Sequence, residues 1–319
     1  EVRNALDRMW PLLSPAELLH DLFGSMALLR LAADGTLDDF EYKALHRPRV
    51  SEVHEVRWTD ADAPLLDEVR ALLGPRPGKA GRLDEAEEIR TYGHIVIDEV
   101  QDLTPMQLRM ASRRSLNGSM TVVGDIAQAT GAHAPDDWDQ VLAHLPDRRP
   151  ARLSELTVGY RIPAQSMALA SRVLRVAAPQ LRPPTSVREG ADPVIARTDP
   201  SGLGALVADQ VAALQQQVDD GSVAVVVPAS LTETVADALD LAGVPFGRAT
   251  RSGLDAPVTL VPVSLVKGLE LDAVVVVEPS RIVREEPQGL RALYVALTRA
   301  TKLLAVAHAE PLPEALVDQ

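Results

Sequence analysis

The sequence predicts an α/β fold built on parallel sheets, divided into two domains and preceded by a helical segment. Unbroken apolar runs of strand length recur along the chain, and a segment with apolar residues at helical spacing follows most of them. This alternation is typical of parallel sheets with helices on their faces. In addition, 319 residues are enough for about two domains with cores of their own.

The first part of the chain, residues 1 to about 45, is expected to be helical. Ser14-Pro15 has the residue types of a helix start, and the stretch 72–82, rich in proline and glycine, indicates a loop. Residues 1–90 are therefore expected to hold a helical segment and a remainder of the first domain or an insertion in it. The helical spacing is set by Leu6, Met9, Leu12, Leu13, Leu18, Leu19 and Leu22.

The two sheet domains are expected at 91–152 and 153–319, with the boundary near residues 150 to 157, around Pro146–Pro150. In the first domain, strands are predicted at 94–97 and 120–123, and each leads into a turn that carries a carboxylate. In the second domain, strands are predicted near 193–196, 223–227, 259–263, 273–277 and 303–307, and helices near 163–178, 202–218, 230–242 and 288–299.

Composition narrows the classes of function. The 32 basic and 45 acidic side chains give a net charge of −13, which argues against a protein that passively coats DNA. No cysteine is present, which excludes disulfides, thiolate metal sites and a cysteine nucleophile. The sequence has no apolar run of membrane-spanning length and no signal peptide, and because it starts with Glu1 we expect it to begin inside a longer protein.

Asp98 and Glu99 follow the apolar strand predicted at 94–97, at the strand end where open α/β sheets bind ligands. Such a pair suits nucleotide hydrolysis: Asp98 would hold magnesium, usually through water, and Glu99 would orient and deprotonate the attacking water. An acidic pair after a strand is also common in solvent-exposed turns that have no catalytic role. These two residues alone therefore leave both interpretations open, a nucleotide site and an ordinary surface turn.

Further polar groups strengthen the prediction. The turn after the second strand carries Asp125 and Gln128, an amide suited to sensing a γ-phosphate. Arg161, in a Gly-Tyr-Arg segment predicted to open a helix, and Arg299, near the end of another, are cations that would stabilise a transferring phosphoryl group. Lone arginines on helices are most often surface residues, so the combination carries the prediction. The segment 267–270, Lys-Gly-Leu-Glu between two apolar strands, completes the set.

Over about residues 92–308, these segments resemble motifs II to VI of the UvrD-like superfamily 1 helicases in order and spacing. The resemblance implies two RecA-like domains of the P-loop NTPase fold, the first of them incomplete, with ATP and Mg²⁺ as cofactors. It implies that Gln128 reports the γ-phosphate, that Arg161 and Arg299 are arginine fingers, and that Glu99 activates water. The implied ATP-binding residues are Asp98, Asp125, Tyr160 (stacked on adenine), Lys267, Gly268 and Glu270 (on the ribose).

The family's phosphate-binding loop, G-x-x-x-x-G-K-[ST], is absent. The nearest string, Gly74–Ala80, has one residue too few, lacks the hydroxyl, and contains prolines that remove amides needed to cradle phosphate. We therefore expect the true loop to lie upstream of Glu1, and we expect the chain alone not to hydrolyse ATP.

The parts that handle nucleic acid strands also depart from the family. The segment Ala129–Ala134 replaces an aromatic stretch that stacks bases, a platform worth about 1–3 kcal/mol per base. The segment 163–258 has room only for the fold itself and not for the family's accessory domain, and 261–266 lacks the usual histidine. Trp138 is expected to pack in the core rather than to replace the platform. We expect binding of nucleic acid to be weakened.

Within the family, the tract Tyr92–Gln107 and the opening around Trp10-Pro11 resemble the HelD-like subgroup of RNA polymerase-associated ATPases. This resemblance implies a cytoplasmic monomer with no membrane contact that binds bacterial RNA polymerase core and uses ATP to release nucleic acid from it. Two alternatives stay open: a UvrD-like 3′–5′ DNA helicase or translocase in repair, and a scaffold without turnover. The joint presence of the acidic pair, Gln128 and both arginines argues against the scaffold.

Overall fold

The computed structural model describes residues 2, 9, 11–75, 89–146, 150–249 and 256–317. They form two compact units. Unit 1 contains the described residues within Glu1–Asp98, Leu103–Val122 and Val141–Arg149, and unit 2 those within Glu99–Asp102, Val123–Gln140 and Pro150–Gln319. Two short stretches from the middle of the sequence therefore fold with the C-terminal part. The predicted domain limits at 90 and 152 stay predictions.

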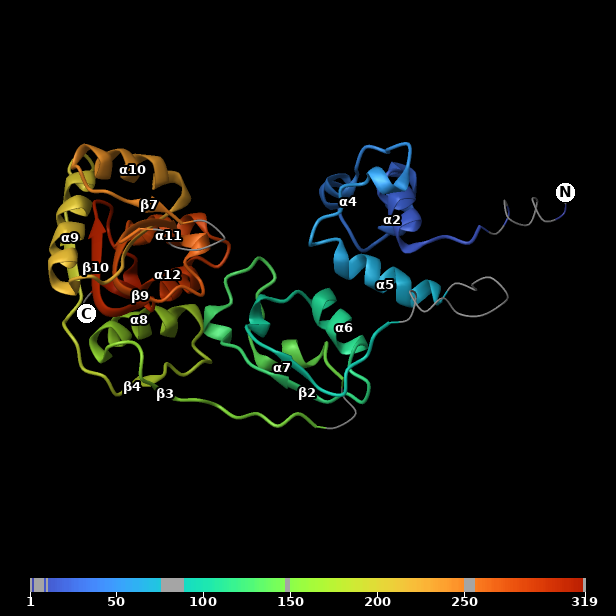
Figure 1. Cartoon of the computed structure of the whole chain (residues 1–319), viewed down its shortest axis with the longest axis horizontal. Helices are drawn as coiled ribbons and strands as arrows, with labels where there is room; N and C mark the ends of the chain where they lie inside the picture. Colours follow the sequence, from blue (N-terminus) through green and yellow to red (C-terminus); the bar gives the residue numbers. More distant parts are fainter. Residues whose placement is uncertain are drawn as a thin grey trace. The chain divides into compact units, whose positions relative to one another are not determined.

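The described part of unit 1 contains the helices α2 (Pro15–Phe23), α3 (Met26–Ala32), α4 (Asp39–Leu45) and α5 (Ala63–Leu73), with a short 3-10 turn η1 at Val53–Glu55 (Figure 1). The predicted start of α2 is confirmed: the Ser14 hydroxyl accepts a hydrogen bond from the Glu17 amide at 3.1 Å, and the Glu17 carboxylate accepts one from the Ser14 amide at 2.6 Å. α5 continues through Leu73, so the loop predicted from residue 72 starts too early; residues 76–82 of it lie outside the described residues.

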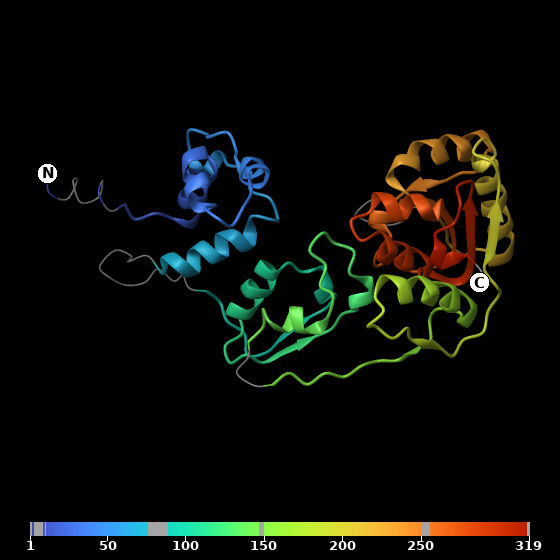
Figure 2. The ribbon, with the colours of Figure 1, turned by 180° about the vertical axis from the view of Figure 1, so that it is seen from behind.

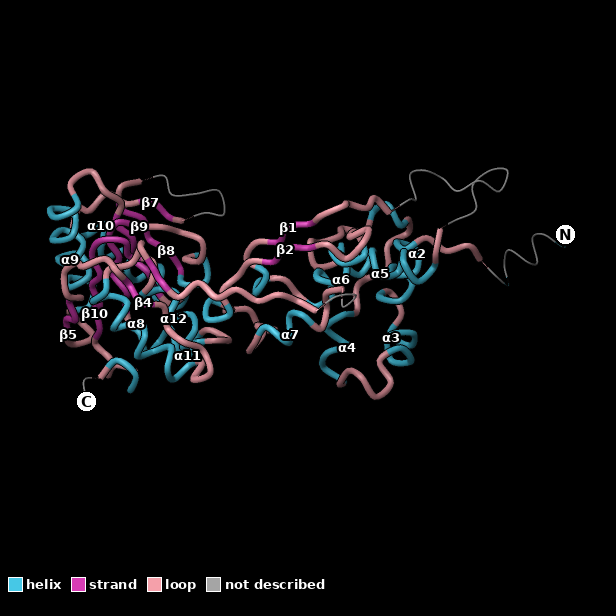
Figure 3. The backbone as a smooth tube through the Cα atoms, turned by 90° about the horizontal axis from the view of Figure 1, so that it is seen from below, coloured by secondary structure: helices cyan, strands magenta, loops and turns pink. Residues whose placement is uncertain are grey.

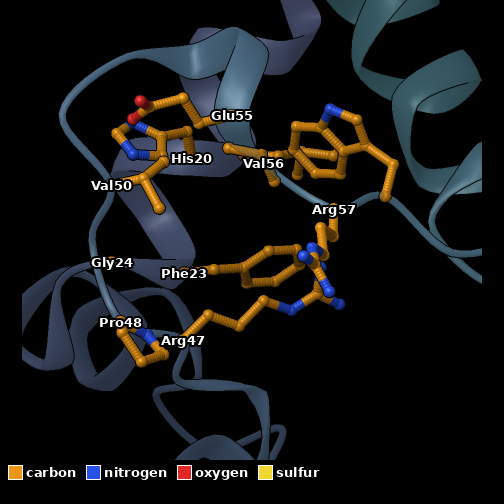
Figure 4. Close-up of a pocket in the computed structure, with 11 residues that line it drawn as sticks. His20, Phe23, Gly24, Arg47, Pro48, Val50, Glu55, Val56 and Arg57 are labelled. Carbon is orange, nitrogen blue, oxygen red and sulfur yellow. The ribbon is translucent and has the colours of Figure 1, made fainter.

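The helices pack around a small apolar core, formed by Leu19, Phe23, Leu29, Ala33, Tyr42 and Val69. Beside it lies a cavity of about 380 Å³, drawn in Figure 4, to which His20, Phe23 and Trp58 contribute. The guanidinium carbon of Arg47 lies 4.8 Å from the centre of the Phe23 ring. None of the predicted site residues lines this cavity. The helical segment therefore has a core and a cavity of its own.

Arg47 also forms a two-pronged ion pair with Asp62, through hydrogen bonds of 3.0 and 2.6 Å. Asp62 is only 1% exposed, and the Arg47 guanidinium lowers the pKa of its carboxyl to about 2, helped by hydrogen bonds from Thr59. A depressed carboxyl pKa stabilises the fold above its ordinary value near 4, and this contribution is lost as the pH falls towards the folded value. The pair therefore makes unit 1 sensitive to acid between about pH 4 and 2.

Asp62→Asn is accordingly expected to lower the free energy of unfolding of unit 1 by roughly 1–2 kcal/mol at pH 7, a figure reduced because Arg47 is partly exposed. The difference from the unmodified protein is expected to be largely lost near pH 2. Urea titrations followed by tryptophan fluorescence at both pH values would measure it. Asp21→Asn is the control, since Asp21 pairs with Arg49 at the surface; equal effects of the two substitutions at pH 7 would contradict the prediction.

The rest of unit 1 is a short parallel ribbon with one helix. β1 (Ile95–Ile97) pairs with β2 (Met120–Val122), Ile95 opposite Met120, and the two strands lie side by side in Figure 3. α6 (Pro105–Arg113) lies between them in sequence and is linked to α5 by ion pairs. Arg113 Nε donates to Asp67 at 2.8 Å, and Arg114 donates to the same carboxylate at 2.6 Å. The predicted strands at 94–97 and 120–123 are thus confirmed to within one residue.

Unit 2 is built on a six-stranded sheet in which every neighbouring pair is parallel. This confirms the predicted parallel α/β fold. Figure 2 shows the edge strand β5 beside β10. The strand order is β5 (Val194–Arg197), β10 (Ala300–His308), β9 (Leu271–Val277), β6 (Val223–Val227), β8 (Val258–Pro262) and β7 (Gly247–Arg248).

Helices cover both faces of this sheet (Figure 1). Along β6, Ala224 and Val226 belong to the core on one face, and Val223, Val225 and Val227 to the core on the other; this explains its unbroken apolar sequence. The first face carries α8 (Ala164–Ala177), α11 (Pro279–Glu285) and α12 (Gly289–Leu297), and the second carries α9 (Leu203–Val218) and α10 (Thr232–Leu241). Among the helices described, none is long and apolar enough to cross a lipid bilayer.

Two further sequence predictions need correction. Arg161 does not open a helix: β3 (Val158–Gly159), which pairs with β4 (Thr185–Ser186), ends two residues before it, and α8 begins only at Ala164. The cause is Pro163, because a proline disfavours helical geometry in the residue before it. Trp138, expected in the core, is half-buried at the start of α7 (Trp138–Leu142), and the buried position there is Val141.

Candidate functional site

The predicted cation Arg299 lies within unit 2 at the amino end of β10, directly after α12. The neighbouring strand β9 starts beside it, since the Leu271 amide donates to the Arg299 carbonyl at 3.3 Å. The side chain is 8% exposed. Its Nε donates to the Val295 carbonyl at 3.2 Å, and its Nη2 donates to Gln128 Oε1 at 2.8 Å. A buried guanidinium is thus held by two directed contacts.

Charged groups of both signs surround Arg299. Burial lowers the pKa of its guanidinium, and the like charge of Arg161 lowers it further. The carboxylates of Glu99 and Asp125 act in the opposite direction. Because an arginine pKa starts far above neutrality, Arg299 remains a cation at physiological pH. The buried site therefore keeps a fixed positive charge among acidic neighbours.

A chain of hydrogen bonds leads from Arg299 to Glu99. Gln128 Nε2 donates to Asp125 Oδ2 at 2.7 Å, and Asp125 caps the 3-10 turn η5 (Ile126–Gln128) by accepting from the Ala127 amide. The Asp125 amide donates to Gln101 Oε1 at 3.0 Å, and Gln101 Nε2 donates to Glu99 Oε2 at 2.5 Å. Four predicted site residues are thereby joined into one polar network.

Lys267 contacts the turn that carries Gln128. Its Nζ donates to the Gln128 carbonyl at 2.7 Å and forms an ion pair with Asp102. Gly268 follows with a φ of +77°, a left-handed conformation that favours glycine, and it turns the chain towards Glu270 and β9. Lys267 therefore contacts protein groups in this structure, and its predicted part in binding ATP stays a prediction.

Arg161 is placed at the solvent-exposed side of unit 2. Its Nη1 lies 2.8 Å from Glu270 Oε1, and both side chains are more than half exposed. Tyr160, beside it in sequence, is 74% exposed. An exposed ring and an exposed cation are suited to a ligand's base and phosphates respectively, because stacking and charge pairing both need open faces.

Asp98 directly follows β1 and belongs to unit 1, whereas the next residue, Glu99, belongs to unit 2. Among the described residues, no group of three or more histidine, aspartate or glutamate side chains forms a ready-made metal cage. Magnesium is commonly held by one or two carboxylates together with substrate phosphates, and a single carboxylate at a strand end fits that mode. Asp98 is the residue that would hold it.

Three side chains in this region were not predicted from the sequence. Gln101 and Asp102 belong to the 3-10 turn η4 (Val100–Asp102), where they contact Glu99 and Lys267. Arg291 donates to the Pro135 carbonyl at 3.1 Å and to Asp136 at 2.9 Å, holding the chain after η5 against α12. A short turn after an acidic pair brings the next polar residues back beside it, and this spacing was the signal available for Gln101.

The segment from β8 to β10 contains a strand, the Lys267–Glu270 turn, a second strand, the helices α11 and α12, and Arg299. Residues 257–307 match the UvrD-like helicase C-terminal domain. The segment that matches this UvrD-like domain contains Lys267, Glu270 and Arg299, and it indicates the C-terminal portion of a helicase-like motor.

Among solved structures, the C-terminal domain of a possible DNA helicase from Lactobacillus plantarum WCFS1 is similar, with 24% identity, a TM-score of 0.41, and coverage of 50% of this chain and 92% of that chain. None of the curated proteins compared matches the chain.

Proposed function

We propose that this chain is the C-terminal motor portion of an ATP-hydrolysing, helicase-like factor that binds RNA polymerase core and releases nucleic acid to recycle it. The observation that carries the ATPase part is the continuous network from Arg299 through Gln128, Asp125 and Gln101 to Glu99. The network joins a buried cation, an amide and a carboxylate through hydrogen bonds. These are groups that phosphoryl transfer to water uses.

In this proposal, Glu99 orients and deprotonates the attacking water. Gln128 exchanges its contact with Arg299 for the γ-phosphate, and the freed guanidinium stabilises charge on the transferring group. Arg161 supplies the second cation, with Tyr160 on the adenine and Glu270 on the ribose. Magnesium held by Asp98 would neutralise charge on the phosphate oxygens. Lys267 and Gly268 shape the turn that faces the nucleotide.

The chain lacks features that bind nucleic acid strands in related helicases, and this favours a protein partner over a DNA fork. The chain after Gln128 has no aromatic residue before Trp138, and Trp138 is half-buried at the start of α7. Between 163 and 258, the described residues are α8, α9, α10 and strands of the same fold. The net charge of −13 disfavours general affinity for nucleic acid. These features support weak strand binding, whereas the proposed catalytic groups Glu99, Gln128, Arg161 and Arg299 are all present.

The test is a pull-down with RNA polymerase core, using a protein that carries this chain and a phosphate-binding loop, together with ATPase assays with and without polymerase and single-stranded DNA. We expect polymerase to bind, and we expect turnover to depend only weakly on DNA. Absence of binding, together with strong stimulation by DNA, would overturn the polymerase proposal.

That second outcome would favour the alternative function, a UvrD-like 3′–5′ DNA helicase or translocase in repair. The match of residues 257–307 to the UvrD-like helicase domain is the observation that keeps this alternative open. A strand-displacement assay on the same protein separates the two, because only the alternative needs the duplex to be unwound.

A further inference from the structure

The side chain of Gln101 is buried and fully engaged, although it is neither an acid nor a cation. It is 2% exposed, and both ends of its amide are used. Nε2 donates to the Glu99 carboxylate at 2.5 Å, and Oε1 accepts from the Asp125 amide at 3.0 Å. A single amide therefore bridges the proposed general base and the backbone of the turn that carries Gln128.

The space for this bridge is built into the neighbouring turn. A Cβ atom added at Gly124 would lie 2.4 Å from Gln101 Oε1 and 2.8 Å from Val100 Cγ1, both far inside van der Waals contact. The Val100 amide donates to the Val123 carbonyl at 3.1 Å, and Val100 is fully buried. The turn of Glu99 thus lies directly on the turn of Asp125, and only glycine fits between them.

Glu99 has a reason to need such a bridge. Its φ is +50°, a left-handed conformation that is uncommon outside glycine and that costs free energy. A strained turn fixes where the side chain leaves the backbone, and an amide donor on one carboxylate oxygen then fixes how the carboxylate is rotated. Orientation matters for a general base, because proton transfer requires hydrogen-bond reach and alignment to the water.

We propose that Gln101 is a positioning residue that locks the Glu99 carboxylate in its catalytic orientation and ties it to the Asp125–Gln128 turn. This inference rests on the proposed ATPase function and adds to it. It means that the group sensing the γ-phosphate and the group activating water move as one body. Gln101 itself needs no contact with the nucleotide.

The test compares Gln101→Leu in two backgrounds, the unmodified protein and Glu99→Gln, in a protein that carries the phosphate-binding loop. Loss of a hydrogen bond to a charged group predicts that kcat falls about 10- to 100-fold in the unmodified background, with little change in KM. In the Glu99→Gln background, no further fall is expected, because the carboxylate to be positioned is already gone.

Gln165→Leu is the matched control, since Gln165 likewise bridges a carboxylate, Glu189, and a backbone amide, that of Gly190. It is expected to leave kcat unchanged. An equal loss from Gln101→Leu in both backgrounds would show a merely structural role and overturn the inference, as would an unchanged kcat. Near-normal hydrolysis by Glu99→Gln would instead sink the proposed catalytic role of Glu99, so the two failures are distinguishable. Melting temperatures of all variants identify any that fail to fold.

Discussion

Replacing Arg299 by lysine, in a protein that also carries a phosphate-binding loop, is expected to lower ATP turnover about 10³-fold or more while nucleotide affinity changes far less. An arginine finger acts mainly on charge that develops in the transition state, and removing one typically costs 10³–10⁵-fold. Lysine keeps the charge but loses the planar fork with which Arg299 reaches both Gln128 and the Val295 carbonyl. Single-turnover kinetics and nucleotide titration measure the two quantities separately.

Arg284→Lys is the control for this experiment, because Arg284 lies on the surface of the same unit and pairs only with Glu310 among the contacts of the described residues. It is expected to leave turnover unchanged. Replacement of Arg161 is expected to follow Arg299, lowering turnover more than affinity. An effect of either site replacement that is confined to affinity would contradict the role of a finger.

Glu99→Gln is expected to keep ATP binding and to lower turnover about 10²- to 10⁴-fold, because an amide cannot accept the proton of the attacking water. The fold should tolerate the change, since a glutamine carbonyl at position 99 can still accept the hydrogen bond from Gln101 that the carboxylate accepts. A nucleotide-binding titration beside a steady-state ATPase assay checks both parts. Hydrolysis at a near-normal rate would remove Glu99 from its assigned role.

Much of the fold could be predicted because a strand that is buried on both faces has an unbroken run of apolar residues. β6 was predicted with its observed bounds, Val223–Val227, since five successive apolar residues are required when helices cover both sides of a parallel strand. β10 was predicted too short, at 303–307: its register shifts between Ala300 and Leu303, so its first residues break the apolar run. The two-residue strands β3, β4 and β7 have no periodicity to detect.

The site was predictable as a set of chemical groups but not as a network. Glu99, Gln128 and Arg299 carry charges or amides at strand and helix ends, where motif spacing reveals them. The spacing after the acidic pair indicates that Gln101 contacts Glu99, but its bridge to the second turn depends on close packing against Gly124, which no local pattern reveals. The role of Arg291 was also not predicted, since its partners, Pro135 and Asp136, are distant in sequence.

The contacts that complete the site join parts of the chain made far apart in time. Asp102 and Lys267 are separated by 165 residues, and Gln128 and Arg299 by 171. At 5–20 residues per second, a ribosome needs roughly 10–30 s to synthesise the second interval. Throughout that time Gln128 lacks its guanidinium partner, and the strand that follows Arg299, β10, is also missing from its place between β5 and β9. A nascent chain that already contains Glu99 therefore lacks the completed hydrogen-bond network until Arg299 has been synthesised.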